Sequence, residues 1–384
     1  MTFKAGRPRS LTAQLKLLAC VALTVSVAAG GAQLMGPRRA KASAVAGPVQ
    51  VGTSFSPRKA AYLGLDWQHA YTELLGMHFK VIRLPAYWNE VDDTGYAQLD
   101  WMMAESAKAG QPVVLTVGMK SLGWPEFYIP DSLEPPAGAA DGSDITIDPD
   151  LRSAALVFVE DVVARYRSNP QLVAWQVENE PFNTAGPQKW WLGQAFVRQE
   201  IQAVKALDPR PVIVTVFSHF NRGLDAASSR QGFDLRRMLG FEVDTAEKDS
   251  LALLGPGDIL GMDVYTRIGY RFLGRDTVST ANDDWDQHVA RWRLNALQQG
   301  ARAWATEAQA EPWEADKSSY TAPKSFGPQN IKPTFTGLKE AGYSTVLLWG
   351  AEYWLWQDHV NGDPRWLRAV RDILVQESRA PALS

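Results

Sequence analysis

The sequence predicts an α/β fold, a (β/α)8 TIM barrel, from two observations. From Val49 onward, short β-rich runs alternate with amphipathic stretches, which is the pattern of a parallel sheet wrapped by helices. Eight such alternations fit within residues 49–377, and a closed barrel takes ~250 residues or more with insertions. An open doubly wound sheet typically has fewer strands and a glycine fingerprint, which this chain lacks.

The predicted strands leave room for a helix after each of them. They begin near Val51, Val81, Val113, Val173, Val212, Ile259, Arg302 and Thr345. The helices are expected over residues 58–78, 97–109, 150–167, 187–207, 224–239, 283–300, 328–341 and 364–377.

Several predicted helices have recognisable ends. Asp148-Pro149-Asp150 can begin a helix, and Asn169-Pro170 lies just past the end of that helix. Gly110 and Gly342 each follow a helix at the position where glycine is favoured. These signals support the alternation of strands and helices.

Two intervals between strands contain insertions. Residues 130–149 are rich in Pro, Gly, Ala and Asp, which predicts a long loop on the face where the strands end. Residues 241–256 form a second insertion before the sixth strand. Neither insertion is long enough to be a domain, so residues 49–377 are expected to form one barrel domain. Residues 378–384 are expected to be a disordered tail.

The first 48 residues predict a targeting segment followed by a linker. A basic start precedes an uncharged stretch from Leu17 to Pro37, and Ala40-Lys41-Ala42 is a candidate cleavage site. Without cleavage, Leu17 to Met35 is just long enough to anchor the chain in a bilayer. Leu17-Leu18-Ala19 before Cys20 suggests a lipoprotein, but the apolar run follows this cysteine instead of preceding it, which disfavours that alternative. We therefore expect an exported protein, either secreted or anchored at the outer face of the cell membrane.

Composition narrows the range of functions. The 384 residues are 46% hydrophobic and 21% charged, with a net charge of −3, which argues against a nucleic-acid-binding surface. The chain has no Gly-rich phosphate loop and no Cys/His cluster with zinc spacing, so neither a cofactor nor a metal is predicted. The five histidines are scattered, which disfavours a metal-dependent hydrolase; they are His69, His78, His219, His288 and His359.

Two glutamates carry the functional prediction. Asn179-Glu180-Pro181 follows the probable strand that begins near Val173, and Glu307 closes the short run that begins near Arg302. The carboxyl ends of barrel strands form the face where catalytic groups collect. Two carboxyl groups from different strands are the minimum for cleaving a glycosidic bond, and retention requires them about 5–5.5 Å apart. Glu178 competes with Glu180, because alternation puts both on the same side of the strand.

These motifs resemble the clan-A retaining glycoside hydrolases, which include cellulases, mannanases and β-galactosidases. The resemblance implies that Glu180 is the acid/base and Glu307 the nucleophile. It further implies roles for four supporting residues: Arg83 would hold the nucleophile ionised, Asn179 would bind the sugar 2-hydroxyl, Tyr265 would hydrogen-bond the nucleophile, and Trp349 would floor the sugar subsite. The chain lacks the histidine of the cellulase-type pattern after the third strand, where Val117-Gly118-Met119-Lys120 stands instead.

The remaining candidates are weaker. Trp88 and Trp124 follow the second and third strands and could stack on sugars at the rim. His219 could contact substrate or merely satisfy a loop carbonyl. Lys120 could bind a carboxylated sugar, although a solvated lysine is favoured. Burial near Trp175 and Phe182 could keep Glu180 protonated.

The predicted function is retaining hydrolysis of a β-linked glycan, with an oligosaccharide or polysaccharide as the partner. A transglycosidase would use the same glutamates, and only product analysis separates the two. A non-catalytic carbohydrate-binding barrel is disfavoured, because such a protein needs no pair of glutamates. Sugar, linkage and oligomeric state stay open.

Overall fold

The computed structural model describes residues 47–133, 139–221, 245–315 and 320–380. Eight parallel strands close into a barrel in the order β1-β10-β9-β6-β5-β4-β3-β2. Their bounds are β1 Gln50–Ser54, β2 Ile82–Pro85, β3 Val113–Val117, β4 Leu172–Val177, β5 Val212–Ser218, β6 Ile259–Val264, β9 Arg302–Gln309 and β10 Thr345–Trp349. The predicted fold class is confirmed, and each predicted strand begins within one residue of its observed start.

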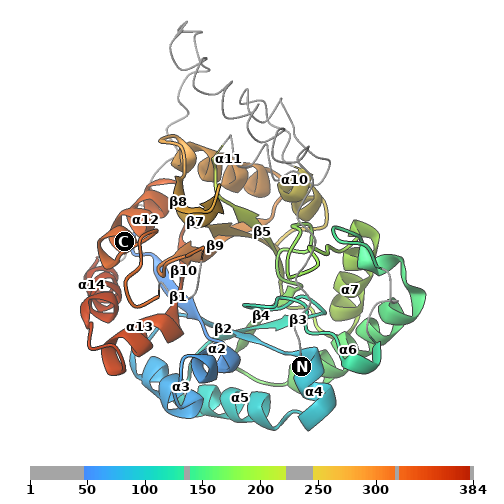
Figure 1. Ribbon diagram of the computed structural model, residues 1–384. Helices are drawn as coiled ribbons and strands as arrows, with labels where there is room; N and C mark the ends of the chain where they lie inside the picture. The colour runs from blue at the N-terminus through green and yellow to red at the C-terminus, as the bar shows by residue number, and fades with distance from the viewer. Residues whose placement is uncertain (1–46, 134–138, 222–244, 316–319, 381–384) are drawn as a thin grey trace, which may run out of the picture. The chain divides into compact units, whose positions relative to one another are not determined.

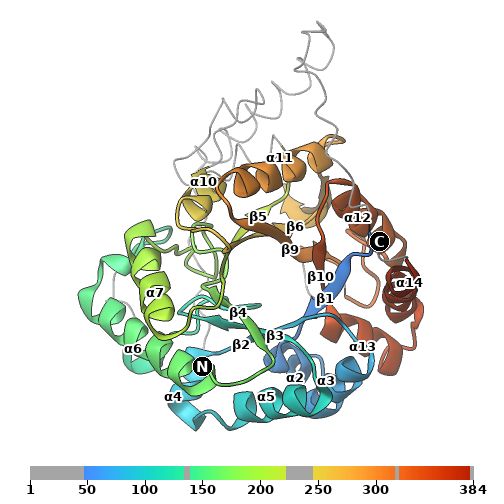
Figure 2. The ribbon, with the colours of Figure 1, turned by 180° about the vertical axis from the view of Figure 1, so that it is seen from behind.

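Helices surround the strands on the outside of the barrel (Figure 1), and the reverse view shows the same ring from behind (Figure 2). Their bounds are α2 Pro57–Tyr62, α3 Trp67–Gly76, α4 Trp88–Thr94, α5 Ala97–Ala109, α6 Pro149–Tyr166, α7 Gln194–Leu207, α10 Thr245–Leu251, α11 Trp285–Gln298, α12 Pro328–Glu340, α13 Ala351–His359 and α14 Arg365–Arg379. The predicted helix over 224–239 lies outside the described residues.

Local sequence explains where several helices begin and end. Asp148 caps α6 by accepting the N–H groups of Asp150 and Leu151, as the sequence predicts. Gly110 takes a left-handed conformation after α5. The single helix expected over 58–78 is instead two helices. Gly64, with φ 78°, ends the first, and Asp66 caps the second by accepting the N–H of His69.

The connections hold further elements that the sequence pattern did not suggest. The segments β7 Arg267–Phe272 and β8 Arg275–Thr280 form an antiparallel hairpin after β6. The insertion 130–149 contains two short 3-10 turns, Asp131–Leu133 and Ile145–Ile147. The helix α14 continues to Arg379, two residues into the segment expected to be a tail, and residues 381–384 lie outside the described part.

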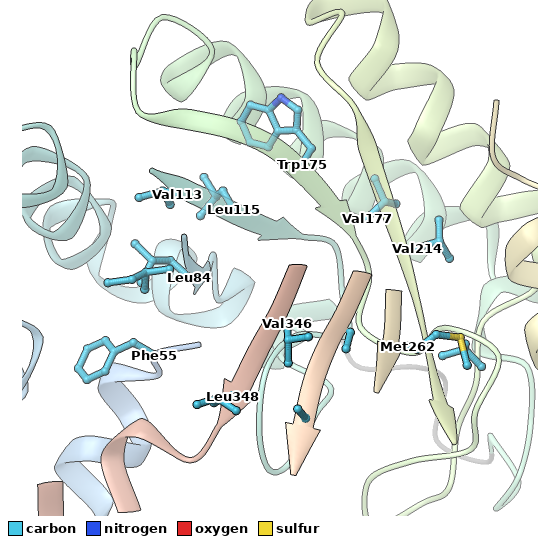
Figure 3. Packing of buried hydrophobic residues seen from close by; sticks show 14 of the residues in the cluster. Phe55, Leu84, Val113, Leu115, Trp175, Val177, Val214, Met262, Val346 and Leu348 are labelled. Carbon is cyan, nitrogen blue, oxygen red and sulfur yellow. The ribbon is translucent and has the colours of Figure 1, made fainter. Parts of the chain in front are cut away.

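The strands alternate between two packing faces. Side chains such as Leu115, Trp175, Val214 and Met262 point away from the barrel axis and pack with the helices (Figure 3). The opposite faces fill the barrel interior with a smaller apolar cluster: Val81, Val114, Ala174, Ile213, Ile259 and Leu347. Inward positions nearer the carboxyl ends are polar or charged, including Arg83, Gln176 and Asp263, and all three are fully buried. The period of two turns these side chains inward, and their positions near the carboxyl ends of the strands gather them at one end of the barrel.

The predicted targeting segment falls in residues 1–46, outside the described residues. Among the residues that the structure does describe, no helix has both the length and the apolar character needed to cross a membrane.

Candidate active site

Glu307 lies at the centre of the polar end of the barrel. Its Oε1 is 2.5 Å from Nη2 of Arg83, and its Oε2 accepts a hydrogen bond of 2.5 Å from the hydroxyl of Tyr265. Glu307 is 3% exposed and Arg83 is fully buried. Charge-assisted bonds of this kind are the strong ones, and they favour the carboxylate anion. The structure therefore holds both oxygens of Glu307 in place at the mouth.

Arg83 is itself fixed by three strands. Its Nε donates to Oγ of Ser54 on β1 at 2.9 Å, and its Nη1 donates to Oε1 of Gln176 on β4 at 2.9 Å. With Glu307 on β9 as the third partner, the guanidinium has little freedom to rotate. Arg83 and Tyr265 therefore both contact Glu307.

A register shift in β9 aims Glu307 at this site. Met262 pairs with Ala305 whereas Asp263 pairs with Glu307, so Thr306 is an extra residue on β9. The pairing of β9 with β10 shifts over the same stretch. Such a bulge re-aims side chains. As a result Thr306 and Glu307, although adjacent, both take part in the polar cluster: Oγ of Thr306 donates to Oδ1 of Asp263 at 2.6 Å.

Glu180 lies beside Glu307 in a different environment. Glu180 is 9% exposed. Its φ of 47° is left-handed, so its side chain does not follow the alternation of faces along β4. Its backbone N–H donates to Oγ1 of Thr215 at 2.8 Å, and its carbonyl accepts from Nζ of Lys120 at 2.7 Å. Burial, followed by the charge of Asp263, raises the pKa of Glu180 well above its usual range. Both effects favour the protonated form of this carboxyl group.

The apolar wall expected to desolvate Glu180 is only partly as predicted. Trp175 points away from the barrel axis and donates its indole N–H to Asp208 at 3.0 Å (Figure 3). Strand alternation explains this, because position 175 faces the helices while 174 and 176 face the interior.

Asp263 is a buried site residue that the sequence analysis missed. One carboxylate oxygen each from Glu180, Asp263 and Glu307 lie within 4.8 Å of one another. Burial, followed by the charge of Glu307, raises the pKa of Asp263 to about 8. Three clustered carboxyl groups are also the donor set that could hold a cation. The sequence signal was present, since Asp263 lies near the carboxyl end of β6, two positions before Tyr265.

Asn179 lies at the same mouth. Its Oδ1 accepts from Nε2 of Gln176 at 3.0 Å, and its backbone N–H donates to the carbonyl of Lys120 at 2.8 Å. Gln176 thus connects Asn179 to Arg83, which shares the same amide side chain.

Glu178 does not share the face of Glu180. Its φ of 59° turns the side chain out of the strand alternation, and its two oxygens accept the N–H groups of Met119 and Lys120 at 2.8 and 2.6 Å. The expectation that both glutamates point the same way is wrong, because left-handed backbone at 178 and 180 breaks the period of two. Glu178 therefore holds the loop after β3 in place.

Lys120 is also not the solvated lysine that the sequence favoured. Its side chain is fully buried, and Nζ donates to the carbonyls of Glu180 and Asn183 and lies 3.4 Å from Oε2 of Glu126. Buried ammonium groups need such partners. Lys120 thus fixes the backbone that carries Glu180.

Aromatic side chains border the carboxyl cluster. Trp349 is 9% exposed, and its Nε1 donates to Oε1 of Glu311 at 2.9 Å. The missed residue Trp313 is 41% exposed and meets the ring of Tyr265 edge-on, with centroids 5.1 Å apart. Exposed faces of this kind can pack on sugar rings.

The three weaker candidates differ in outcome. Trp124 is 60% exposed, on the loop after β3. Trp88 instead begins α4 and stacks on Phe158 with centroids 5.4 Å apart, so a sugar cannot reach it. His219 is buried, with Nδ1 at 2.6 Å from the carbonyl of Tyr265 and Nε2 at 2.8 Å from Ser279. Burial lowers the pKa of His219, so this ring is a neutral structural group.

No family model matches the chain, and no curated protein sequence matches it. Among solved structures, the barrel is similar to GH5_18 from Streptomyces cattleya in complex with GlcNAc, with a TM-score of 0.56 and 16% identity over 89% of this chain and 83% of that one. GH5_18 from Bifidobacterium longum has a TM-score of 0.56 and 14% identity, covering 87% of this chain and 81% of that one. A beta-galactosidase from Rahnella sp. has a TM-score of 0.54 and 13% identity, covering 88% and 57%.

At these identities the likeness establishes the fold. The chain has a closed eight-stranded barrel like those of these solved structures, so the fold that the resemblance implied is confirmed.

Proposed function

We propose that this protein is a retaining glycoside hydrolase that cleaves a β-linked glycan, with Glu307 as nucleophile and Glu180 as acid/base. One observation carries the proposal: two buried glutamates lie close together at the barrel mouth in opposite electrostatic environments. Glu307 receives a guanidinium and a phenol, whereas Glu180 is desolvated and faces other carboxyl groups. Environments that separate two carboxyl groups in this way define an acid and a nucleophile.

The spacing supports retention over inversion. Oxygen atoms of Glu180 and Glu307 lie within 4.8 Å of each other. Retaining enzymes have carboxyl groups about 5–5.5 Å apart, whereas inverting enzymes need about 6.5–9.5 Å to admit a water molecule. The close pair leaves a direct attack by Glu307 as the favoured first step.

In that step an oxygen of Glu307 bonds to the anomeric carbon while the glycosidic C–O bond breaks. The proton of Glu180 passes to the leaving oxygen, which leaves Glu180 as a carboxylate. Water then attacks the anomeric carbon, gives a proton to Glu180 and releases Glu307. Arg83 and Tyr265 would orient Glu307 for attack, since each contacts a different oxygen of it.

The choice of a β-linked glycan draws on the fold neighbours. They include the beta-galactosidase from Rahnella sp. and an exo-beta-1,4-mannosidase from Opitutaceae bacterium strain TAV5, which has a TM-score of 0.52 at 11% identity. Trp313, which is 41% exposed and contacts Tyr265, supplies aromatic surface on which a sugar ring can pack, whereas Trp349 is only 9% exposed.

Azide rescue tests the two roles separately. Glu180→Ala should retain its first step on an activated aryl β-glycoside, and azide should restore turnover to a glycosyl azide of retained configuration. Glu307→Ala should lose turnover on all glycosides, and any azide product should have inverted configuration. Exchanged stereochemistry would reverse the assignment. A wild-type protein that binds glycans but cleaves none of a panel of aryl glycosides and polysaccharides would instead be a binding barrel.

A further inference from the structure

A two-carboxylate mechanism does not use Asp263, yet this residue lies within the catalytic cluster. Its side chain is fully buried on β6, inside the barrel. One of its oxygens lies within 4.8 Å of oxygens of both Glu180 and Glu307. Burying a third carboxyl group here costs free energy unless the group has a partner, so its presence calls for an explanation.

The two oxygens of Asp263 differ in their surroundings. Oδ1 accepts the hydroxyl of Thr306 at 2.6 Å. Oδ2 is buried and meets no N–H or hydroxyl donor among the described residues. The carboxyl group of Glu180 is the candidate partner, because one of its oxygens lies within 4.8 Å of an oxygen of Asp263. A bond between two carboxyl groups requires that one of them carries a proton.

Glu307 does not compete for that proton, because its oxygens are already taken by Arg83 and Tyr265. Two adjacent buried carboxyl groups cannot both ionise readily, so the proton belongs to the Glu180–Asp263 pair. Burial raises the pKa of both members, that of Asp263 to about 8 and that of Glu180 well above its usual range.

The charged groups around the pair indicate where the proton lies. They come from β2, the loop after β3, and β9, and they are Arg83, Lys120, Glu126 and Glu307. Arg83 and the hydrogen bond from Thr306 favour the anion on Asp263. Lys120 favours the anion on Glu180, but its Nζ contacts the backbone carbonyl of that residue and the carboxylate of Glu126. Because Asp263 already accepts the hydroxyl of Thr306, the contacts favour the proton on Glu180.

We propose that Asp263 is a positioning residue that accepts a hydrogen bond from the protonated carboxyl of Glu180 and holds Glu180 as the acid before the leaving group arrives. The inference rests on the proposed function, because it assigns a use to the acid/base. When Glu180 gives its proton to the leaving oxygen, two adjacent carboxylates result. Their repulsion makes Glu180 a stronger base toward the attacking water, whose proton restores the original pair.

The pH profile of Asp263→Asn tests this role. Removing the neighbouring negative charge should lower the pKa of Glu180, so the alkaline limb of kcat/KM should move about one to two pH units toward acid. Activity lost at neutral pH should return at lower pH. The loss should be large for glycosides with poor leaving groups and small for dinitrophenyl glycosides, which need no proton.

Asp258→Asn is the matched control. Asp258 is buried just before the same strand but at its other end, where it accepts from Lys205 and from the backbone of Val212. This variant should leave the alkaline limb in place. An Asp263→Asn profile that falls equally at every pH, or equally for all leaving groups, would mean a structural role and overturn the proposal.

Infrared spectroscopy gives a readout that needs neither turnover nor a folded Asp263 variant. At pH 7 the wild-type spectrum minus that of Glu180→Gln should contain one protonated carboxyl band. Absence of that band overturns the shared proton even if the enzyme is active. If the band is present but the wild type cleaves no glycoside, the proposed function fails while the carboxyl pair stands.

A chelation experiment tests the alternative that the three clustered carboxyl groups bind a cation. Wild-type activity should be unchanged after EDTA treatment. Loss of activity that Mg²⁺, Ca²⁺ or Mn²⁺ restores would place a cation among the carboxylates and overturn the shared proton.

Discussion

At the scale of single residues, the site depends on giving chemically identical side chains different neighbours. Glu307 receives two donors from Arg83 and Tyr265, whereas Glu180 has a carboxyl neighbour and little solvent. The difference arises from position alone, since both are glutamates at the same end of the barrel.

Tyr265→Phe should weaken catalysis without unfolding the barrel. The lost hydrogen bond is to the proposed nucleophile, and hydrogen bonds to charged groups contribute about 1.5–3 kcal/mol, so kcat/KM should fall about 10- to 150-fold. Steady-state kinetics on an aryl glycoside measures this. Tyr343→Phe is the control, because its buried hydroxyl donates to the carbonyl of Val289. It should change stability but not kcat, and an equal loss in both variants would contradict the role of Tyr265.

Position 118 requires glycine because the carboxyl group of Glu178 leaves no room for a Cβ. A Cβ at this position would lie 2.3 Å from the carboxyl carbon of Glu178, and φ is 116°. Gly118→Ala should therefore lower the free energy of unfolding by more than the ~1–2 kcal/mol that unfavourable φ alone costs. Gly362→Ala is matched, since φ is 69° and nothing lies within 4 Å. Urea unfolding of both variants checks this, and equal destabilisation would rule out the clash.

At the scale of elements, α7 is attached to the active-site loops by a pair of buried acids. Glu200 on α7 and Glu178 after β4 are both fully buried, and each affects the pKa of the other. Burial, followed by the charge of Glu178, raises the pKa of Glu200 well above its usual range, and burial raises that of Glu178 to about 7. One acid must therefore carry a proton for α7 to pack in this place.

This pair predicts how stability depends on pH. A raised folded-state pKa means that the stabilisation is fully present below the unfolded value of 4.5 and is lost as pH rises through the folded value. The loss has a limiting slope of about 1.4 kcal/mol per pH unit for each proton. Glu200→Gln keeps a donor for Glu178 but cannot ionise. The variant should lose less stability than the wild type between pH 6 and pH 9 in urea unfolding, and parallel pH dependences would contradict this origin.

At the scale of the whole molecule, the prediction of export concerns residues 1–46, whereas the barrel begins with β1 at Gln50. We expect a chain lacking residues 1–46 to fold with an unchanged melting temperature, because the described barrel closes through strand pairing between β1 and β10. Differential scanning calorimetry of the full and shortened chains measures this. A large drop in the melting temperature would mean that the segment packs on the domain.

The same segment should direct the protein out of the cytoplasm. In a bacterial host the full chain should be recovered outside the cytoplasm, either shortened near residue 43 or held in the membrane fraction. The shortened chain should remain in the cytoplasm with unchanged glycosidase activity. Recovery of both chains in the cytoplasm would contradict the prediction of export.

The sequence by itself determined the barrel and the main residues at its mouth. Alternating β-rich runs, helix-capping residues and glycines at helix ends are local signals. The starts of all eight barrel strands and of most helices could therefore be predicted from neighbouring residues. The end of a strand also fixes an approximate place in a barrel, which is why Arg83, Glu180, Tyr265 and Glu307 could be grouped before any coordinates.

Only the tertiary structure decided what depends on departures from that regularity. The extra residue Thr306 in β9 and the left-handed backbone at Glu178 redirect side chains, and a period-two pattern cannot foresee either. Burial of Lys120 and the burial of Trp88 against Phe158 depend on segments far apart in the chain. The role inferred for Asp263 has the same origin, because its meaning comes from two glutamates on other strands that lie within a few ångströms of it.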